Sequence, residues 1–269
     1  MISRIPNPEA MMNLLMKTAF FLAVSCAWFV HGGSLATAGT AEPPMPTALC
    51  PFAADIAPGV EKYGLIDTSG KVVVPPKYDY FYGFDKQGMG RFYVEGAGMG
   101  FVDAEGNEVI PPGLLAVSPF GDNGRAVFIN SDGDYGIIDK NGEIAQTTFQ
   151  YLSSFNHDRA IFKSNDRFGF VNGSGDTAIH NFYFHVSPFD DAGLAVVGFE
   201  LDNNMLVDTE GRDVTSNRYE WIYGFWDGME LSPFRRGGKW GYLDREGREA
   251  IEPRFEFVGC FGANGQVNE

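Results

Sequence analysis

The stretch Lys239-Trp240-Gly241-Tyr242-Leu243-Asp244-Arg245-Glu246-Gly247-Arg248 decides the fold, because its pattern returns along the chain at nearly constant spacing. Its skeleton is Gly-x-x-Asp-x-x-Gly, and the second glycine stands at positions 70, 106, 142, 175, 211 and 247. The steps between these glycines are 36, 36, 33, 36 and 36 residues. Six copies at such a period predict a tandem repeat architecture.

A phenylalanine recurs with the same regularity, 13 or 14 residues after each of these glycines, at positions 84, 120, 155, 189, 225 and 261. Each period divides into four short apolar runs bounded by turn residues, and no segment shows a helical period. In the second copy these runs are 91–94, 99–102, 108–110 and 114–117. We therefore expect an all-β chain of six repeats of about 36 residues, built from short antiparallel strands.

The last run of each repeat is apolar both three and six residues before the phenylalanine, as at Val117 and Leu114. Positions an odd number apart lie on opposite faces of a strand, so this run is expected to be buried on both sides. Each small sheet must then lie between two others. A β-propeller-like ring satisfies this requirement, and an open β-solenoid-like stack is the alternative.

With these columns assembled, the sequence resembles the WG-repeat family of bacterial proteins. The resemblance is carried by Lys239-Trp240-Gly241-Tyr242-Leu243-Asp244 with Gly247 and Ile251-Glu252-Pro253, and by Tyr63-Gly64 to Gly70 with Val73-Val74-Pro75-Pro76. It covers residues 49–269. Trp240 alone carries the family's tryptophan, and the copy at Asn204-Met205 lacks the glycine. The resemblance implies a repeat architecture and brings no catalytic residues.

Residues 1–38 are predicted to be a signal peptide. Lys17 precedes the apolar stretch Thr18–Val30, and Ala36-Thr37-Ala38 is a small-x-small cleavage site. The stretch is short for a bilayer-spanning anchor, so no membrane insertion is expected after cleavage. We expect the protein to be exported, as a periplasmic or secreted protein. A lipoprotein anchored at Cys26 is the alternative.

The rest of the chain divides into a linker and one domain. Residues 39–48 are rich in proline and poor in core-forming side chains, so they are predicted to be a flexible linker. Residues 49–269 hold all six copies and are predicted to be a single WG-repeat β domain.

Cys50 and Cys260 remain after signal cleavage, one near each end of the domain. Leu49-Cys50-Pro51-Phe52 resembles the closing run Val117-Ser118-Pro119-Phe120, and Val258-Gly259-Cys260-Phe261 is another closing run. Both cysteines then hold nearly the same place in the repeat. A disulfide needs Cα atoms within about 7 Å, which a closed ring provides and a stack of sheets does not. In an oxidising compartment we expect a Cys50–Cys260 bond, and two separate thiols are the alternative.

Composition limits the classes of partner. The chain has 20 Lys and Arg against 35 Asp and Glu, a net charge of −15. Binding to nucleic acid or to an anionic membrane surface depends on Lys and Arg, so neither partner is expected. The chain shows no nucleophile elbow, zinc-protease motif, Cys-x-x-Cys or phosphate-binding loop. We therefore expect no enzyme activity, no cofactor and no metal.

Trp226, Arg235 and Arg236 are the candidate partner contacts, because Trp and Arg dominate binding hot spots and this arginine pair stands in an acidic chain. The sequence favours an exported, non-enzymatic binding or scaffold module for a protein or glycan partner in the cell envelope. The alternative is an envelope polymer hydrolase or lyase with its site in a propeller channel.

Overall fold

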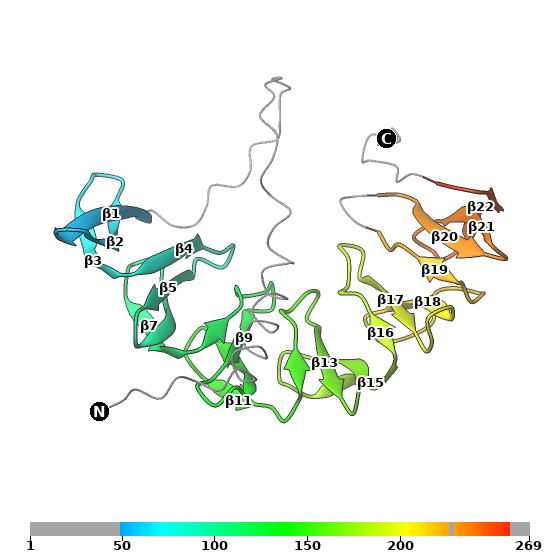
Figure 1. Cartoon of the computed structure of the whole chain (residues 1–269), viewed down its shortest axis with the longest axis horizontal. Helices are drawn as coiled ribbons and strands as arrows, with labels where there is room; N and C mark the ends of the chain where they lie inside the picture. Colours follow the sequence, from blue (N-terminus) through cyan, green and yellow to red (C-terminus); the bar gives the residue numbers. More distant parts are fainter. Residues whose placement is uncertain (1–48, 226–228, 259–269) are drawn as a thin grey trace, which may run out of the picture. The chain divides into compact units, whose positions relative to one another are not determined.

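The computed structural model describes residues 49–225 and 229–258. Within these ranges it consists of β-strands and turns, without a helix. The strands form six small antiparallel sheets, which Figure 1 shows in sequence colours. The all-β fold class with six tandem repeats is therefore confirmed. The signal peptide and linker predicted for residues 1–48 lie outside the described residues.

The sheets follow one another along the chain, each an antiparallel meander. The first three sheets contain β1 (Leu49–Ala57), β2 (Val60–Asp67) and β3 (Val72–Tyr78); β4 (Tyr80–Phe84), β5 (Gly90–Val94), β6 (Gly98–Val102) and β7 (Glu108–Leu114); and β8 (Ala116–Val117), β9 (Arg125–Ile129), β10 (Tyr135–Asp139) and β11 (Ile144–Gln146). The last three contain β12 (Tyr151–Leu152), β13 (Ala160–Ser164), β14 (Arg167–Val171) and β15 (Thr177–Tyr183); β16 (His185–Val186), β17 (Leu194–Gly198) and β18 (Asn204–Asp208); and β19 (Trp221–Ile222), β20 (Ser232–Arg236), β21 (Lys239–Leu243) and β22 (Glu249–Phe255).

The aspartate of the repeated motif closes the turn that follows its strand. In the last copy, Oδ1 of Asp244 accepts the backbone N–H groups of Glu246 at 3.1 Å and Arg248 at 2.9 Å. Asn172 makes the equivalent bonds to residues 174 and 176 at 3.0 Å each, so an amide oxygen is sufficient. Gly247 follows with φ of +74°, a conformation that glycine adopts without steric cost.

The first glycine of the motif allows two strands to approach closely. A Cβ atom at Gly241 would lie 2.4 Å from the carbonyl oxygen of Ile251, where the ladder between β21 and β22 is irregular. The fifth copy has Met205 at this place. There the partner on that side is a bridge between Val207 and Asp213 in place of a strand, which leaves room for a side chain. The distance to the neighbouring strand therefore explains both the glycine at position 241 and the methionine at position 205.

Each complete sheet begins with the apolar run that the sequence analysis placed at the end of the preceding repeat. Leu114 ends β7, whereas Val117 lies in β8 and pairs with Phe128 of the next sheet. The prediction of one strand over 114–117, buried on both faces, is therefore wrong. The chain passes from one sheet to the next at Leu115, and the two apolar positions pack because they belong to neighbouring sheets.

The place of Leu49–Phe52 in the repeat also differs from the prediction. Phe52 pairs with Gly64 as Phe92 pairs with Gly100, so β1 is equivalent to β5, the second strand of its sheet, and not to a closing run. Leu231-Ser232-Pro233-Phe234, which runs into β20, is the matching tetrapeptide. Cys50 therefore occupies the place of Gly90, and the two cysteines are not equivalent.

Neighbouring sheets share apolar cores. In one cluster, Leu65 of β2 and Tyr78 of β3 pack with Phe81 of β4 and Phe92 of β5. The rings of Tyr78 and Phe92 stack with centroids 4.2 Å apart. Each fully buried large side chain contributes about 1.5–3 kcal/mol, so these clusters hold consecutive sheets together.

Candidate aromatic binding site

Each sheet carries one row of directly opposed residues across its strands, which we call the central row. In the sheet of β19–β22 the row is Trp221, Arg235, Trp240 and Phe255. In the sheet of β12–β15 it is Tyr151, Lys163, Phe168 and Tyr183. The residue at the family's tryptophan position is the third member of both rows. Opposed residues project from the same face, so each row forms a band of large side chains.

The central row of the β16–β18 sheet departs from this pattern. It contains His185, Gly198 and Asn204, followed by Tyr219 through an isolated bridge. In two other sheets this position holds a tyrosine ring that packs on the first strand of the next sheet: Tyr63 on Tyr80 and Tyr135 on Tyr151, each with centroids 5.9 Å apart. Asn204 has no ring to place against Trp221.

A cavity of about 190 Å³ occupies this position. Its lining residues are His185, Val186, Ser187, Val196, Asn204, Trp221, Ile222 and Tyr223. Trp221 and Tyr223 are 48% and 47% exposed, so they are half open to solvent. The cavity is smaller than the pockets of about 300 Å³ or more that hold drug-sized ligands, and it suits a single small ring.

Asn204 and His185 form the polar side of the cavity. The Asn204 side-chain amide donates to the carbonyl oxygens of residues 219 and 220, at 3.2 and 3.0 Å. Its Oδ1 faces Nε2 of His185 across Gly198, where any Cβ atom would collide with both side chains. Because Oδ1 can only accept, Nε2 carries the proton. A neutral His185 then has Nδ1 as an acceptor.

Aromatic rings continue from the cavity over the neighbouring sheet. Tyr223 lies with its ring centroid 6.4 Å from that of Trp221 and 5.7 Å from that of Trp240. We call Trp221, Tyr223 and Trp240 the aromatic face. The exposed side chain of Arg235 stands between the two tryptophans in the central row. The face therefore offers stacking surfaces next to a cation.

The structure separates the candidate contact residues predicted from sequence. Arg235 lies on the aromatic face, with Nε 3.6 Å from a carboxylate oxygen of Glu220. Arg236 is the next residue along β20, so it projects from the other face, and it forms an ion pair with Glu249 at 2.6 Å. Trp226 lies outside the described residues. Trp221 and Tyr223, which the sequence analysis did not single out, are exposed aromatic side chains here.

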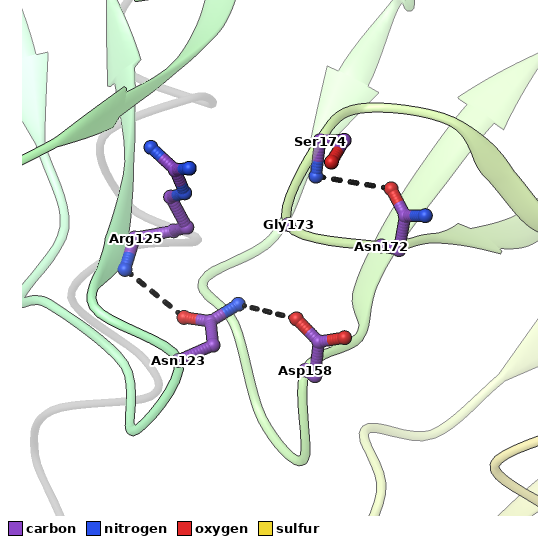
Figure 2. Close-up of a pocket in the computed structure, with 6 residues that line it drawn as sticks. All are labelled: Asn123, Arg125, Asp158, Asn172, Gly173 and Ser174. Atoms are coloured by element: carbon purple, nitrogen blue, oxygen red, sulfur yellow. Dashed lines mark hydrogen bonds between the residues drawn. The ribbon is translucent and has the colours of Figure 1, made fainter. Parts of the chain in front are cut away.

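A second, polar cavity of about 220 Å³ lies where turns of two neighbouring sheets meet, and Figure 2 shows its lining. Asn123 links its two sides: Oδ1 accepts the backbone N–H of Arg125 at 3.0 Å, and Nδ2 donates to Asp158 at 2.9 Å. The guanidinium of Arg125 also pairs with Asp139 at 3.1 Å. These groups already bind one another, so this cavity is a junction between sheets rather than a site prepared for a ligand.

Two further properties concern the described residues. Over 49–225 and 229–258, no three His, Cys, Asp or Glu side chains gather as a metal ion requires. In the same ranges there is no helix of the length and apolarity needed to cross a membrane.

The sheets and their exposed aromatic face define a class of protein: a β-repeat binding or scaffold module. A model of the WG containing repeat matches residues 63–96, 99–133, 135–168 and 240–265. These four matches support a WG-repeat family protein, as the sequence resemblance predicted.

Solved structures with similar folds are distant. One structure of Hsv2 from Kluyveromyces lactis is 10% identical with a TM-score of 0.35; the alignment covers 59% of this chain and 57% of that one, little more than half its length. Sqt1 of Saccharomyces cerevisiae is 12% identical with a TM-score of 0.38, over 82% of this chain and 79% of that one. BamB of Moraxella catarrhalis is 10% identical with a TM-score of 0.35, over 75% and 69%. These similarities assign no function to the chain, and no curated protein matches it.

Proposed function

We propose that this protein is an exported, non-enzymatic binding module that holds a glycan on the aromatic face, with one sugar ring in the cavity beside Trp221. The cavity formed at Asn204 is the observation that carries this proposal. The signal-peptide pattern of residues 1–38 supports export, and an envelope glycan is a ligand available to an exported protein.

The chemistry of the cavity favours a sugar over a purely apolar ligand. A pyranose ring presents C–H groups on its faces and hydroxyl groups around its edge. Trp221 and Tyr223 offer amphipathic rings for the apolar faces. Nδ1 of His185 can accept a hydrogen bond from a hydroxyl group, and the Arg235 guanidinium can donate to hydroxyl or carboxyl oxygens. A few polar groups placed among aromatic walls are typical of small-molecule sites.

Among the described residues, Asp190 is a candidate acid or base for the hydrolase or lyase alternative. Asp190 is buried, and burial raises the pKa of its carboxyl group above the ordinary value. Its Oδ1 accepts the backbone N–H groups of Ala192 and Leu194, at 2.8 and 3.0 Å. The carboxylate therefore closes a turn, as Asp85 does in an earlier copy.

A glycan array that includes N-acetylhexosamine and hexose polymers tests the proposal, with the mature protein as the probe. We expect binding to at least one polymer class, and a loss of at least tenfold in affinity for Trp221→Ala. Tyr80→Ala is the matched control: Tyr80 holds the same place in its sheet and is 49% exposed, but Tyr63 packs on it. Its affinity should equal wild type.

Three outcomes would refute the proposal: no glycan bound, equal binding by Trp221→Ala, or capture of proteins alone. Cleavage of a bound polymer would support the hydrolase or lyase alternative instead. Thermal unfolding of each variant shows whether a loss of binding reflects a loss of the fold.

A further inference from the structure

Two of the central rows carry a lysine or arginine among the described residues: Lys163 in the β12–β15 sheet and Arg235 in the β19–β22 sheet. Lys163 is held within its own sheet. It forms an ion pair with Asp166 at 2.8 Å, and its ammonium group lies 5.9 Å from the centre of the Phe168 ring. Its charge is therefore already engaged.

Arg235 has a weaker partner. Its Nε lies 3.6 Å from a carboxylate oxygen of Glu220, longer than a hydrogen bond. The other oxygen of Glu220 accepts the backbone N–H of Gly238 at 3.0 Å, so the turn between β20 and β21 positions this carboxylate. The side chain of Arg235 is 46% exposed, and within 49–225 and 229–258 its guanidinium donates no hydrogen bond. The two terminal nitrogens are therefore available to a ligand.

The position of Arg235 places these nitrogens beside the cavity. Arg235 is opposite Trp221 on β19 and opposite Trp240 on β21, in strands that lie side by side (Figure 1). Opposed residues of antiparallel strands have Cα atoms about 4.5–5.5 Å apart and project from the same face. A sugar ring that stacks on Trp221 therefore has one edge next to the guanidinium.

The equivalent place in the β12–β15 sheet is closed. Tyr151, which is opposite Lys163, is covered by the ring of Tyr135 with centroids 5.9 Å apart. Trp221, which is opposite Arg235, lines the cavity instead. Of these two rows, the one in the β19–β22 sheet combines an available cation with an open aromatic ring.

We propose that the sugar bound beside Trp221 is a hexuronate, whose carboxylate accepts two hydrogen bonds from the Arg235 guanidinium. In a hexuronate this carboxylate projects from the edge of the ring, where a hexose has a hydroxymethyl group. The planar fork of a guanidinium matches the two oxygens of a carboxylate, and such charge-assisted bonds are about twice as strong as bonds between neutral groups. This inference rests on the proposed function, because it names the class of sugar for the same cavity.

The acidic composition of the chain is compatible with this ligand. Binding of nucleic acid requires many phosphates to be neutralised by Lys and Arg, whereas a hexuronate brings one carboxylate to the site. Charges further than about 8 Å from that carboxylate are largely screened at physiological ionic strength. The net charge of −15 is spread over the whole chain, and Arg235 is the cation that the carboxylate meets locally.

Matched pairs of oligosaccharides test the proposal with the mature protein. Each pair is a trisaccharide of glucuronate, galacturonate or mannuronate and the same trisaccharide with its carboxyl groups reduced to alcohols. Calorimetric titration should show at least one acid form bound about tenfold more tightly than its reduced form, because hydrogen bonds to a charged group are the stronger ones. Arg235→Gln should abolish this preference and leave the affinity for the reduced form unchanged.

Three results would overturn the hexuronate assignment. They are equal affinity of the wild type for both forms of every pair, an undiminished acid preference in Arg235→Gln, and a parallel loss of both forms in a folded Arg235→Gln protein. Lys163→Gln is the matched control, since it removes one positive charge from the same place of a row that is closed. Its acid preference should equal that of the wild type.

Trp221→Ala separates this inference from the proposed function. Loss of both forms in Trp221→Ala, together with equal affinity of the wild type for the two forms, would overturn the hexuronate assignment and retain the glycan site. Binding of neutral glycans of the array alone would have the same meaning. Failure of the wild type to bind any glycan would overturn both proposals.

Discussion

Replacement of Asp85 by Asn should weaken the connection between two sheets without disturbing the turn that holds the residue. Oδ1 of Asp85 accepts the backbone N–H groups of Gln87 at 2.9 Å and Met89 at 3.0 Å. Oδ2 accepts the backbone N–H of Phe120, 35 residues further on, at 2.9 Å. Asparagine retains one acceptor oxygen and replaces the other with a donor.

The magnitude follows from the burial of Phe120, which is 5% exposed. In Asp85→Asn its N–H would face an amide NH₂ group and lose its acceptor in a place that water does not reach. An unsatisfied buried donor costs about 1–3 kcal/mol. For a domain of this size we expect a decrease in Tm of about 4–8 °C, from about 2 kcal/mol.

The matched control is Asp67→Asn, in a turn where Ser69 and Lys71 donate their hydrogen bonds to the same carboxylate oxygen, Oδ1. Oδ1 of Asp67 accepts from the backbone of Ser69 at 2.8 Å and of Lys71 at 3.0 Å. Asn172 makes this turn naturally. Urea unfolding followed by tryptophan fluorescence should give a lower midpoint for Asp85→Asn and a wild-type midpoint for Asp67→Asn. Equal midpoints for both variants would refute the inter-sheet role.

Three further predictions concern stability. Gly241→Ala should lower Tm by more than 5 °C in calorimetry, from roughly 2 kcal/mol or more of strain, whereas Gly113→Ala, with open space around it, should not. The backbone N–H of Glu95 and the Lys62 ammonium hold the pKa of Asp79 below its usual value. The contribution of Asp79 to the free energy of unfolding is therefore present above about pH 4 and is lost as pH falls through the lowered pKa. Acid unfolding monitored by circular dichroism should show this loss, and Asp79→Asn should reduce it. Burial and the nearby Glu249 carboxylate raise the pKa of Tyr219 to about 12. The contribution of Tyr219 to the free energy of unfolding is therefore present below about pH 10 and is lost as pH rises toward 12. Phenolate absorbance should show that Tyr219 ionises in this range, together with unfolding.

The repeat could be predicted from sequence because its constraints are local. The glycine at 247 needs a positive φ, and the aspartate at 244 closes a turn of four residues. Such requirements keep a glycine at this place in every copy and an aspartate or asparagine three residues before it. The assignment of each run to one sheet or the next could not be predicted in this way. A run such as 114–117 has the same composition whether it lies in one sheet or passes between two.

The cavity could not be predicted, because it depends on residues from several strands. Asn204 and Gly198 are small where other copies have larger side chains, and Trp221 belongs to the next sheet. The degenerate copy was visible in the sequence as Asn204-Met205. Reading that loss as a space for a ligand required the register that places Asn204 against Trp221.

Fluorine NMR of the mature protein labelled with fluorotryptophan tests most directly whether the altered repeat is the binding site. Trp221, Trp226 and Trp240 would each give one resonance, assigned by Trp→Phe variants. On titration with the glycan selected from the array, we predict a saturable shift of the Trp221 resonance, larger than that of either other tryptophan. A Trp221 resonance that does not move at saturating glycan would contradict the account.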